Sequence, residues 1–183
     1  MEEMKCKHIR SVCFFFIVIP FFLFFLTVNV AIGFDDADLQ RLKSTNQCPG
    51  CNLTGVVLSG AKLPNAKLAG ANISSASISN STLANTDFSG ANMSYINLTR
   101  ADLTGANMSN ADLRVAILVN AKLEKANLSK ANLAGAALFD ANSTGANLDG
   151  ANLTGAFLAG AIWVDGEKCN EGSKGECKKQ AEP

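Results

Sequence analysis

The sequence predicts an all-β fold whose main part is a closed solenoid that turns a corner every five residues. Three observations carry this prediction: a large apolar residue recurs at every fifth position from Leu53 to Trp163, a small residue stands two positions before most of these centres, and polar residues and glycine fill most other positions. A period of five fits neither the 3.6-residue helix nor the two-residue strand. The small and large residues are therefore expected to line a narrow interior, with the other three positions facing water.

The repeat runs from Cys51 to Asp165 as 23 consecutive units without an insertion or deletion. Its centres are Leu, Ile, Met or Phe, except for Ser143 and Trp163. One such unit buries nothing by itself, so the units must stack on one another and both ends need covers. We expect the Ser143 hydroxyl to bond the backbone at a local weak point, and Trp163 to close the C-terminal mouth.

Units such as Ala101-Asp102-Leu103-Thr104-Gly105 follow the pattern A-(D/N)-L-x-x, which resembles the pentapeptide-repeat proteins over about two thirds of the chain. The resemblance implies a right-handed quadrilateral β-helix with four units, or twenty residues, in each coil. The 23 units would then make between five and six coils. At a strand spacing of about 4.8 Å, these coils would form a rod on the order of 27 Å long.

The N-terminal residues 1–33 have the three-part layout of a secretory signal peptide. Basic residues precede a nearly continuous apolar run over residues 11–30, and Ala31-Ile32-Gly33 supplies small residues for cleavage before Phe34. An uncleaved membrane anchor is the alternative, because residues 11–33 could just span a bilayer. Pro20 within the run favours cleavage. The expected location is therefore periplasmic or extracellular, with the thylakoid lumen as a further option.

Both ends of the repeat are expected to carry covers. Residues 35–43 place acidic residues before basic ones, which is typical of a short helix, and Leu39 lies outside the five-residue register. The expected domains are a signal peptide (1–33), an N-terminal helical cap (34–50), the β-solenoid (51–165), and a C-terminal cap and tail (166–183).

Four cysteines remain after removal of the N-terminal segment, and an even number in an exported protein indicates disulfides. They lie in two pairs at opposite ends of the rod, farther apart than the ~7 Å Cα separation that a bridge tolerates. The expected bridges are Cys48–Cys51 and Cys169–Cys177. A redox role for the C-x-x-C pair is an alternative, but its cysteines follow a helix and open a solenoid rather than starting a helix after a strand.

No catalytic triad, carboxylate pair, phosphate loop or metal cluster can be assembled from this sequence, and the only histidine, His8, lies in the segment to be removed. Asp87, Asp102 and Asp112 precede centres and should face solvent. We expect no catalytic, cofactor-binding or metal-binding residues, and therefore a non-enzymatic structural or protein-interaction module.

Charge disfavours nucleic acid as a ligand. Residues 34–183 hold 13 basic and 14 acidic residues, a formal charge of −1, whereas phosphate binding needs a basic field. Some pentapeptide-repeat proteins shield DNA gyrase as acidic mimics of DNA, which is the second functional alternative. Basic residues are expected among the outward positions here: Lys62, Lys67, Arg100, Arg114, Lys122, Lys125 and Lys130.

One side of the predicted coil departs from the polar rule. It is centred on residues 58, 78, 98, 118, 138 and 158, and apolar residues flank its last three centres: Ile117, Val119, Ala137, Phe139, Phe157 and Ala159. A contiguous exposed apolar patch indicates a contact surface. We expect this stripe to bind a protein partner or a second copy of the chain. The alternative is that the tail after Gly166 folds back over it.

Overall fold

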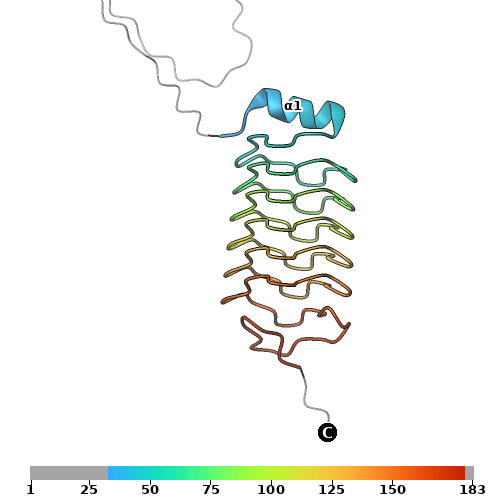
Figure 1. Ribbon diagram of the computed structural model, residues 1–183, viewed down its shortest axis with the longest axis vertical. Coiled ribbons are helices and arrows are strands. Elements are labelled where there is room, and N and C mark those ends of the chain that lie inside the picture. The colour runs from blue at the N-terminus through green and yellow to red at the C-terminus, as the bar shows by residue number, and fades with distance from the viewer. Residues whose placement is uncertain (1–32, 180–183) are drawn as a thin grey trace, which may run out of the picture. The chain divides into compact units, whose positions relative to one another are not determined.

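The computed structural model describes residues 33–179 (Figure 1), so the predicted signal peptide lies outside the described residues apart from Gly33. Within this range the structure has one helix, α1 (Asp36–Thr45), followed by a stack of four-sided coils. No helix among the described residues is long and apolar enough to cross a membrane.

The coils pair through single-residue parallel bridges between positions twenty residues apart, such as Asn52 with Asn72 and Asn72 with Asn92. At the first of these, Leu53 N donates to Asn72 O at 2.7 Å and Asn72 N donates to Cys51 O at 2.8 Å. Four five-residue units therefore complete one coil. The first bridge joins Gln47 to Lys67, so backbone pairing begins ahead of Cys51, where the apolar pattern starts.

Each corner of the coil is a tight turn built around a residue with positive φ. At one of them Ala61 N donates to Leu58 O at 3.0 Å, and Gly60 between them has φ +75°. A single positive φ at the third residue is the geometry of a type II turn. Glycine and asparagine tolerate it well, and asparagine occupies Asn65, Asn80, Asn85, Asn110 and Asn120. The β-branched Val115 adopts φ 57° at one corner, where the clash of its Cβ with the backbone is costly.

The interior is a narrow column of alternating small and large side chains. Ala101 and Leu103 are typical, both with no exposed surface. Two inward hydroxyls bond the backbone of the preceding coil: Ser81 Oγ donates to Leu58 O at 3.1 Å, and Thr86 Oγ1 donates to Leu63 O at 2.8 Å. Ser143 is also buried, and Trp163 is half-buried against the core.

Helix α1 lies across the N-terminal end of the stack (Figure 1). Asp35 caps its start by accepting a bond from Ala37 N at 2.7 Å, and Leu39 and Leu42 are buried beneath it. The Asp38 carboxylate accepts from Asn52 N at 2.8 Å, which joins the helix to the first coil. This contact gives a backbone donor of the first coil a partner that no earlier coil could supply.

The segment after the last coil turns back and pairs with it in the antiparallel sense, through Ile162 with Lys168 and Phe157 with Lys174. Leu158 N donates to Ser173 O at 3.0 Å, and Gly160 N donates to Cys169 O at 3.1 Å. This pairing occupies backbone groups that would otherwise form an open strand edge.

The corner geometry predicts that Val115→Asn stabilises the protein by about 1 kcal/mol, because asparagine adopts positive φ at less steric cost than a β-branched residue. The matched control is Asn120→Val, at the next corner of the same coil and also at φ 57°. It should destabilise by a similar amount. Urea unfolding measures the change in the free energy of unfolding for both variants. Changes of the same sign in the two variants would contradict a steric cost of the β-branched residue at positive φ.

Candidate interaction surface

The six residues predicted to form an apolar stripe lie together on one side of the C-terminal coils. Bridges align Ile117, Ala137 and Phe157 on successive coils. Ile117, Phe139 and Phe157 are 41%, 37% and 40% exposed. Val119, Ala137 and Ala159 are half-buried between them. We call these six residues the apolar stripe.

The two phenylalanines of the stripe pack against each other. The ring centroids of Phe139 and Phe157 are 5.7 Å apart and the planes are 25° from parallel. Because Phe139 follows one centre and Phe157 precedes the next centre on that side, the contact crosses from one coil to its neighbour. This stacking holds both rings at the surface in a defined orientation.

Two exposed apolar residues beside the stripe were not predicted from the sequence. Tyr95 is 63% exposed and Val115 is 46% exposed, and both occupy corners leading into the striped side, one coil apart. Aligning the corner positions at intervals of twenty residues would have revealed them. Val57 is 74% exposed on the same side, but Ser77 and Asn97 separate it from the stripe along the column.

The C-terminal segment reaches the end of the stripe without covering it. Lys174 pairs with Phe157 through the backbone, and its ammonium group lies 5.1 Å from the centre of the Phe157 ring. Phe157 nevertheless keeps 40% of its surface exposed. Among residues 33–179, the C-terminal segment therefore leaves Ile117, Phe139 and Phe157 each more than a third exposed.

The four predicted disulfide cysteines lie in two pairs with their sulfur atoms at bonding distance. The Cα atoms of Cys48 and Cys51 are 5.4 Å apart, and those of Cys169 and Cys177 are 5.1 Å apart. Cys48 and Cys51 are 0% and 1% exposed beneath α1. Thiol exchange requires access to a sulfur atom, so this burial does not favour the redox alternative.

Asp38 lies close enough to Cys48 and Cys51 for the three to share an ion, but only free thiolates could serve as ligands. In the bonded state the guanidinium of Arg41 occupies this place, with Nη2 2.9 Å from Asp38 Oδ1 and 2.7 Å from Cys51 Sγ. The cluster therefore functions as a contact between α1 and the first coil.

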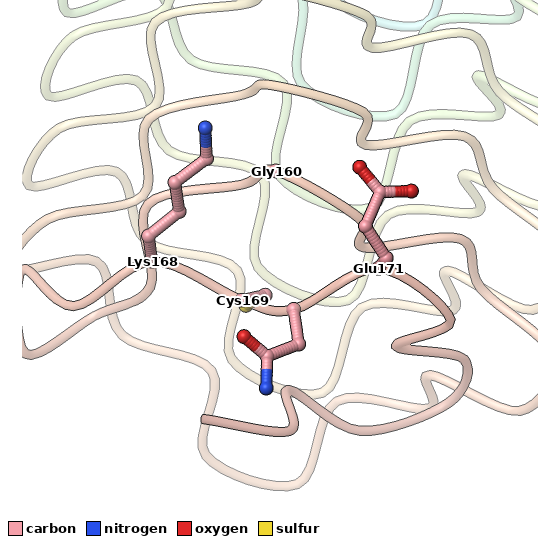
Figure 2. Close-up of a pocket in the computed structure, with 5 residues that line it drawn as sticks. Gly160, Lys168, Cys169 and Glu171 are labelled. Carbon is pink, nitrogen blue, oxygen red and sulfur yellow. The ribbon is translucent and has the colours of Figure 1, made fainter. Parts of the chain in front are cut away.

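A shallow pocket of about 240 Å³ lies beside the C-terminal segment, lined by Gly160, Lys168, Cys169, Asn170 and Glu171. Figure 2 shows Lys168 and Glu171 rising on its two sides. Cys169 is held in a disulfide, and both charged residues are exposed to solvent. This set offers no activated nucleophile and no buried acid or base of the kind that catalysis needs.

Asp102 and Asp112 take the outward bridge position, as predicted, and each binds the turn that follows it. Hydrogen bonds from Thr104 hold the pKa of Asp102 below its usual range, with nearby Lys122 adding to the effect. Arg114 does the same for the pKa of Asp112, with Nη2 2.6 Å from Oδ2. The physical role of these carboxylates is therefore to stabilise turns.

The outward charges are mixed on every side of the coil. The bridge positions of one side read Asn52, Asn72, Asn92, Asp112, Asn132, Asn152. The side beginning at Lys67 continues Asp87, Asn107, Asn127, Asn147. Among the described residues no side has more than one acidic residue at these positions. This distribution does not favour the acidic mimicry of DNA.

A profile described as pentapeptide repeats matches the chain in eight copies, over residues 51–90, 83–118, 116–155 and 144–162. No curated protein matches the chain. The profile confirms the resemblance inferred from the five-residue units, and it covers the coils that carry the apolar stripe.

A solved structure shows the same fold. The chain is similar to a trypsin-treated variant of QnrB1, a plasmid-mediated fluoroquinolone resistance protein, with 24% identity over 63% of this chain and 58% of that one and a TM-score of 0.60. With the profile, this likeness identifies the coils as a right-handed quadrilateral β-helix.

Two further structures are similar in sequence. HetL, a pentapeptide repeat protein involved in heterocyst differentiation regulation in the cyanobacterium Nostoc sp. strain PCC 7120, is 30% identical over 67% of this chain and 65% of its own, with a TM-score of 0.39. A pentapeptide repeat protein of the Arabidopsis thaliana thylakoid lumen is 33% identical over 61% of this chain and 71% of its own, with a TM-score of 0.34. The chain spans less than two thirds of the length of HetL and of QnrB1.

The lowered pKa of Asp102 predicts a loss of stability in acid. Because the pKa is lower in the folded chain than in the unfolded chain, the stabilisation is complete above the unfolded value of about 3.9 and is lost as the pH falls through the folded value. Asp102→Asn keeps an oxygen that can accept from Thr104 but cannot be protonated in this range. Its unfolding free energy should therefore fall less steeply than the wild type below about pH 4. Urea unfolding at a series of pH values measures the two slopes, and identical slopes would refute the assignment.

Proposed function

The chain belongs to the pentapeptide-repeat family. We propose that it is an exported, non-enzymatic module that binds a protein through its apolar stripe. The observation that carries the proposal is that Ile117, Phe139 and Phe157 lie on three successive coils of one side, each with more than a third of its area exposed. Single exposed apolar residues are ordinary, whereas a contiguous patch on a polar scaffold marks a contact surface.

The scaffold suits such a role because it holds the stripe rigidly. Every coil under the stripe is bonded to the coils on either side, for example by Ile117 N to Ile96 O at 2.8 Å and by Leu118 N to Ala137 O at 2.7 Å. The rings of Phe139 and Phe157 are already ordered by stacking. A partner would therefore bind without a large loss of side-chain conformational entropy on this side of the interface.

Export is supported by the sequence of residues 1–33 and by the cysteines. In residues 1–33, a basic zone, an apolar zone and a zone of small residues follow one another in the order of a signal peptide. The remaining four cysteines stand in two pairs at bonding distance, which suits a compartment where disulfides persist. A periplasmic, extracellular or lumenal location would supply the oxidising conditions.

We assign the two ends of the stack a protective role. Helix α1 buries Leu39 and Leu42 over the first coil, and the Cys48–Cys51 bridge lies directly beneath it. The Cys169–Cys177 bridge fastens the segment that pairs with the last coil. Each disulfide closes a short loop, which in the chain-entropy description contributes about 2–3 kcal/mol.

Export predicts a specific intact mass for the protein isolated from its own cells. The mass should begin at Phe34, and alkylation without reduction should leave all four remaining cysteines unmodified. After reduction and unfolding, four alkyl groups should be added. A full-length mass, or alkylation of Cys48 and Cys51 without reduction, would contradict the exported, disulfide-bonded form.

Replacing both Phe139 and Phe157 by Ser should abolish partner binding while the coils stay folded, because both side chains point outward. Loss of buried aromatic anchors typically weakens binding by tenfold or more. The measurement is affinity purification from the source cells followed by identification of the bound proteins, including an untagged second copy. Val57→Ser, on the same side but outside the stripe, is the matched control. Equal recovery with all three proteins would contradict the proposal.

A further inference from the structure

Large and small residues alternate across the two aromatic coils of the apolar stripe. Call the residues before the centres the first column (Ile117, Ala137, Phe157) and those after the centres the second column (Val119, Phe139, Ala159). On one coil the first column is small and the second large, as Ala137 and Phe139. On the next coil the order is reversed, as Phe157 and Ala159.

This alternation is self-complementary when a twofold axis runs parallel to the stack axis. A twofold axis parallel to the stack axis brings the striped side of a second copy face to face with the first, keeps each coil at its own level and exchanges the two columns. Phe139 then faces Ala137 of the second copy, and Phe157 faces Ala159 of the second copy. Each phenylalanine therefore meets an alanine, so the two aromatic coils are self-complementary, as a twofold interface requires.

The edges of the striped side agree with the same arrangement. Tyr95 and Arg100 stand at the two corners of one coil, on opposite edges of this side, and both are exposed. Because the twofold axis exchanges the two edges, the Tyr95 ring of each copy lies beside Arg100 of the other copy. One cation–π contact can therefore form at each edge of the interface. Among residues 33–179, Arg100 makes no ion pair that would compete.

Antiparallel arrangements use the whole stripe less well. With the twofold axis midway between the coils of Ala137 and Phe157, Phe139 meets Ala159 and Phe157 meets Ala137 of the second copy, but Ile117 then faces the level of the exposed Lys174 instead of an apolar residue. With the twofold axis at the level of Ala137, Phe139 meets its own counterpart and Asp140, exposed at the neighbouring corner, meets Asp140 of the second copy. Like charges placed opposite each other are unfavourable. With the axis at the level of Ile117, Phe139 meets Thr99 of the second copy, and the aromatic rings lose their apolar partners.

We infer that the occupant of the apolar stripe is a second copy of this chain, held side by side and parallel in a twofold dimer. The inference rests on the proposed function, because it uses the same surface, and it goes further by naming the partner and its orientation. Tyr95, outside the six stripe residues, joins the interface at its edge.

Exchanging the large and small residues on one coil tests both the partner and the orientation. Ala137→Phe places large against large, and Phe139→Ala leaves small against small, so each variant alone should weaken the dimer about tenfold or more. The double variant Ala137→Phe/Phe139→Ala reverses the order and restores the fit, so its dissociation constant should return to within about threefold of the wild type. Sedimentation equilibrium at concentrations up to about 100 µM measures all four proteins, and circular dichroism melting verifies that each is folded.

The outcomes separate this inference from the proposed function. A wild-type protein that is monomeric throughout this range overturns the second copy as partner. If the wild type is monomeric but recovers another protein from cells, and the variant with Ser at both Phe139 and Phe157 does not recover it, the stripe is a binding surface for that other protein. In that case the proposed function holds and only the dimer is contradicted. A dimer that the single variants do not weaken, or that the double variant does not restore, overturns the parallel twofold arrangement.

Discussion

The structure depends on a tight turn at every fifth residue. Each turn needs one residue with positive φ, and the positions from Gly50 to Gly160 supply it without interruption. Because the turns are evenly spaced, the backbone between them is too short for an ordinary strand, and each side contributes a single bridge residue. The closed coil, the narrow interior of Ala and Leu, and the vertical columns of outward residues all follow from this spacing. A missing turn would displace every residue after it.

A stack of identical coils has two ends that the repeat itself cannot satisfy. The first coil has backbone donors and acceptors that no earlier coil can bond, and the last coil has backbone donors and acceptors that no later coil can bond. Residues outside the repeat solve both problems by different means. At the start a helix supplies a carboxylate, Asp38, to Asn52 N. At the finish the chain returns antiparallel, so that Ser173 O and Cys169 O receive bonds from the last coil. The disulfides lie at these two places.

Much of this architecture could be predicted from the sequence, because the position of a residue within the five-residue unit indicates whether its side chain is buried or exposed. Leu103 and Ala101 could be placed inside and Asp102 outside from spacing alone, and the stripe from Ile117 to Ala159 followed once the units were aligned at twenty residues. That alignment came from the family resemblance, since a period of five does not by itself set the number of sides. Tyr95 and Val115 were missed because corner positions accept many residue types, so apolar residues there resemble ordinary variation. The return of Lys168 to Gly175 along the last coil could not be foreseen, because that segment has no repeat.

Because the register is unbroken, the number of residues between α1 and the stripe determines the side of the stack on which the stripe lies. Because bridged residues are twenty apart, a deletion or duplication of twenty residues between Asn65 and Asn110 would shorten or lengthen the stack by one coil and leave the stripe on its original side. A change of five residues would satisfy every local turn equally well, yet it would turn the C-terminal coils a quarter revolution relative to α1. The protein can therefore vary in length only by whole coils if the stripe is to stay on the same side relative to α1. The twenty-residue coil, rather than the five-residue unit, is the smallest insertion or deletion that preserves this surface.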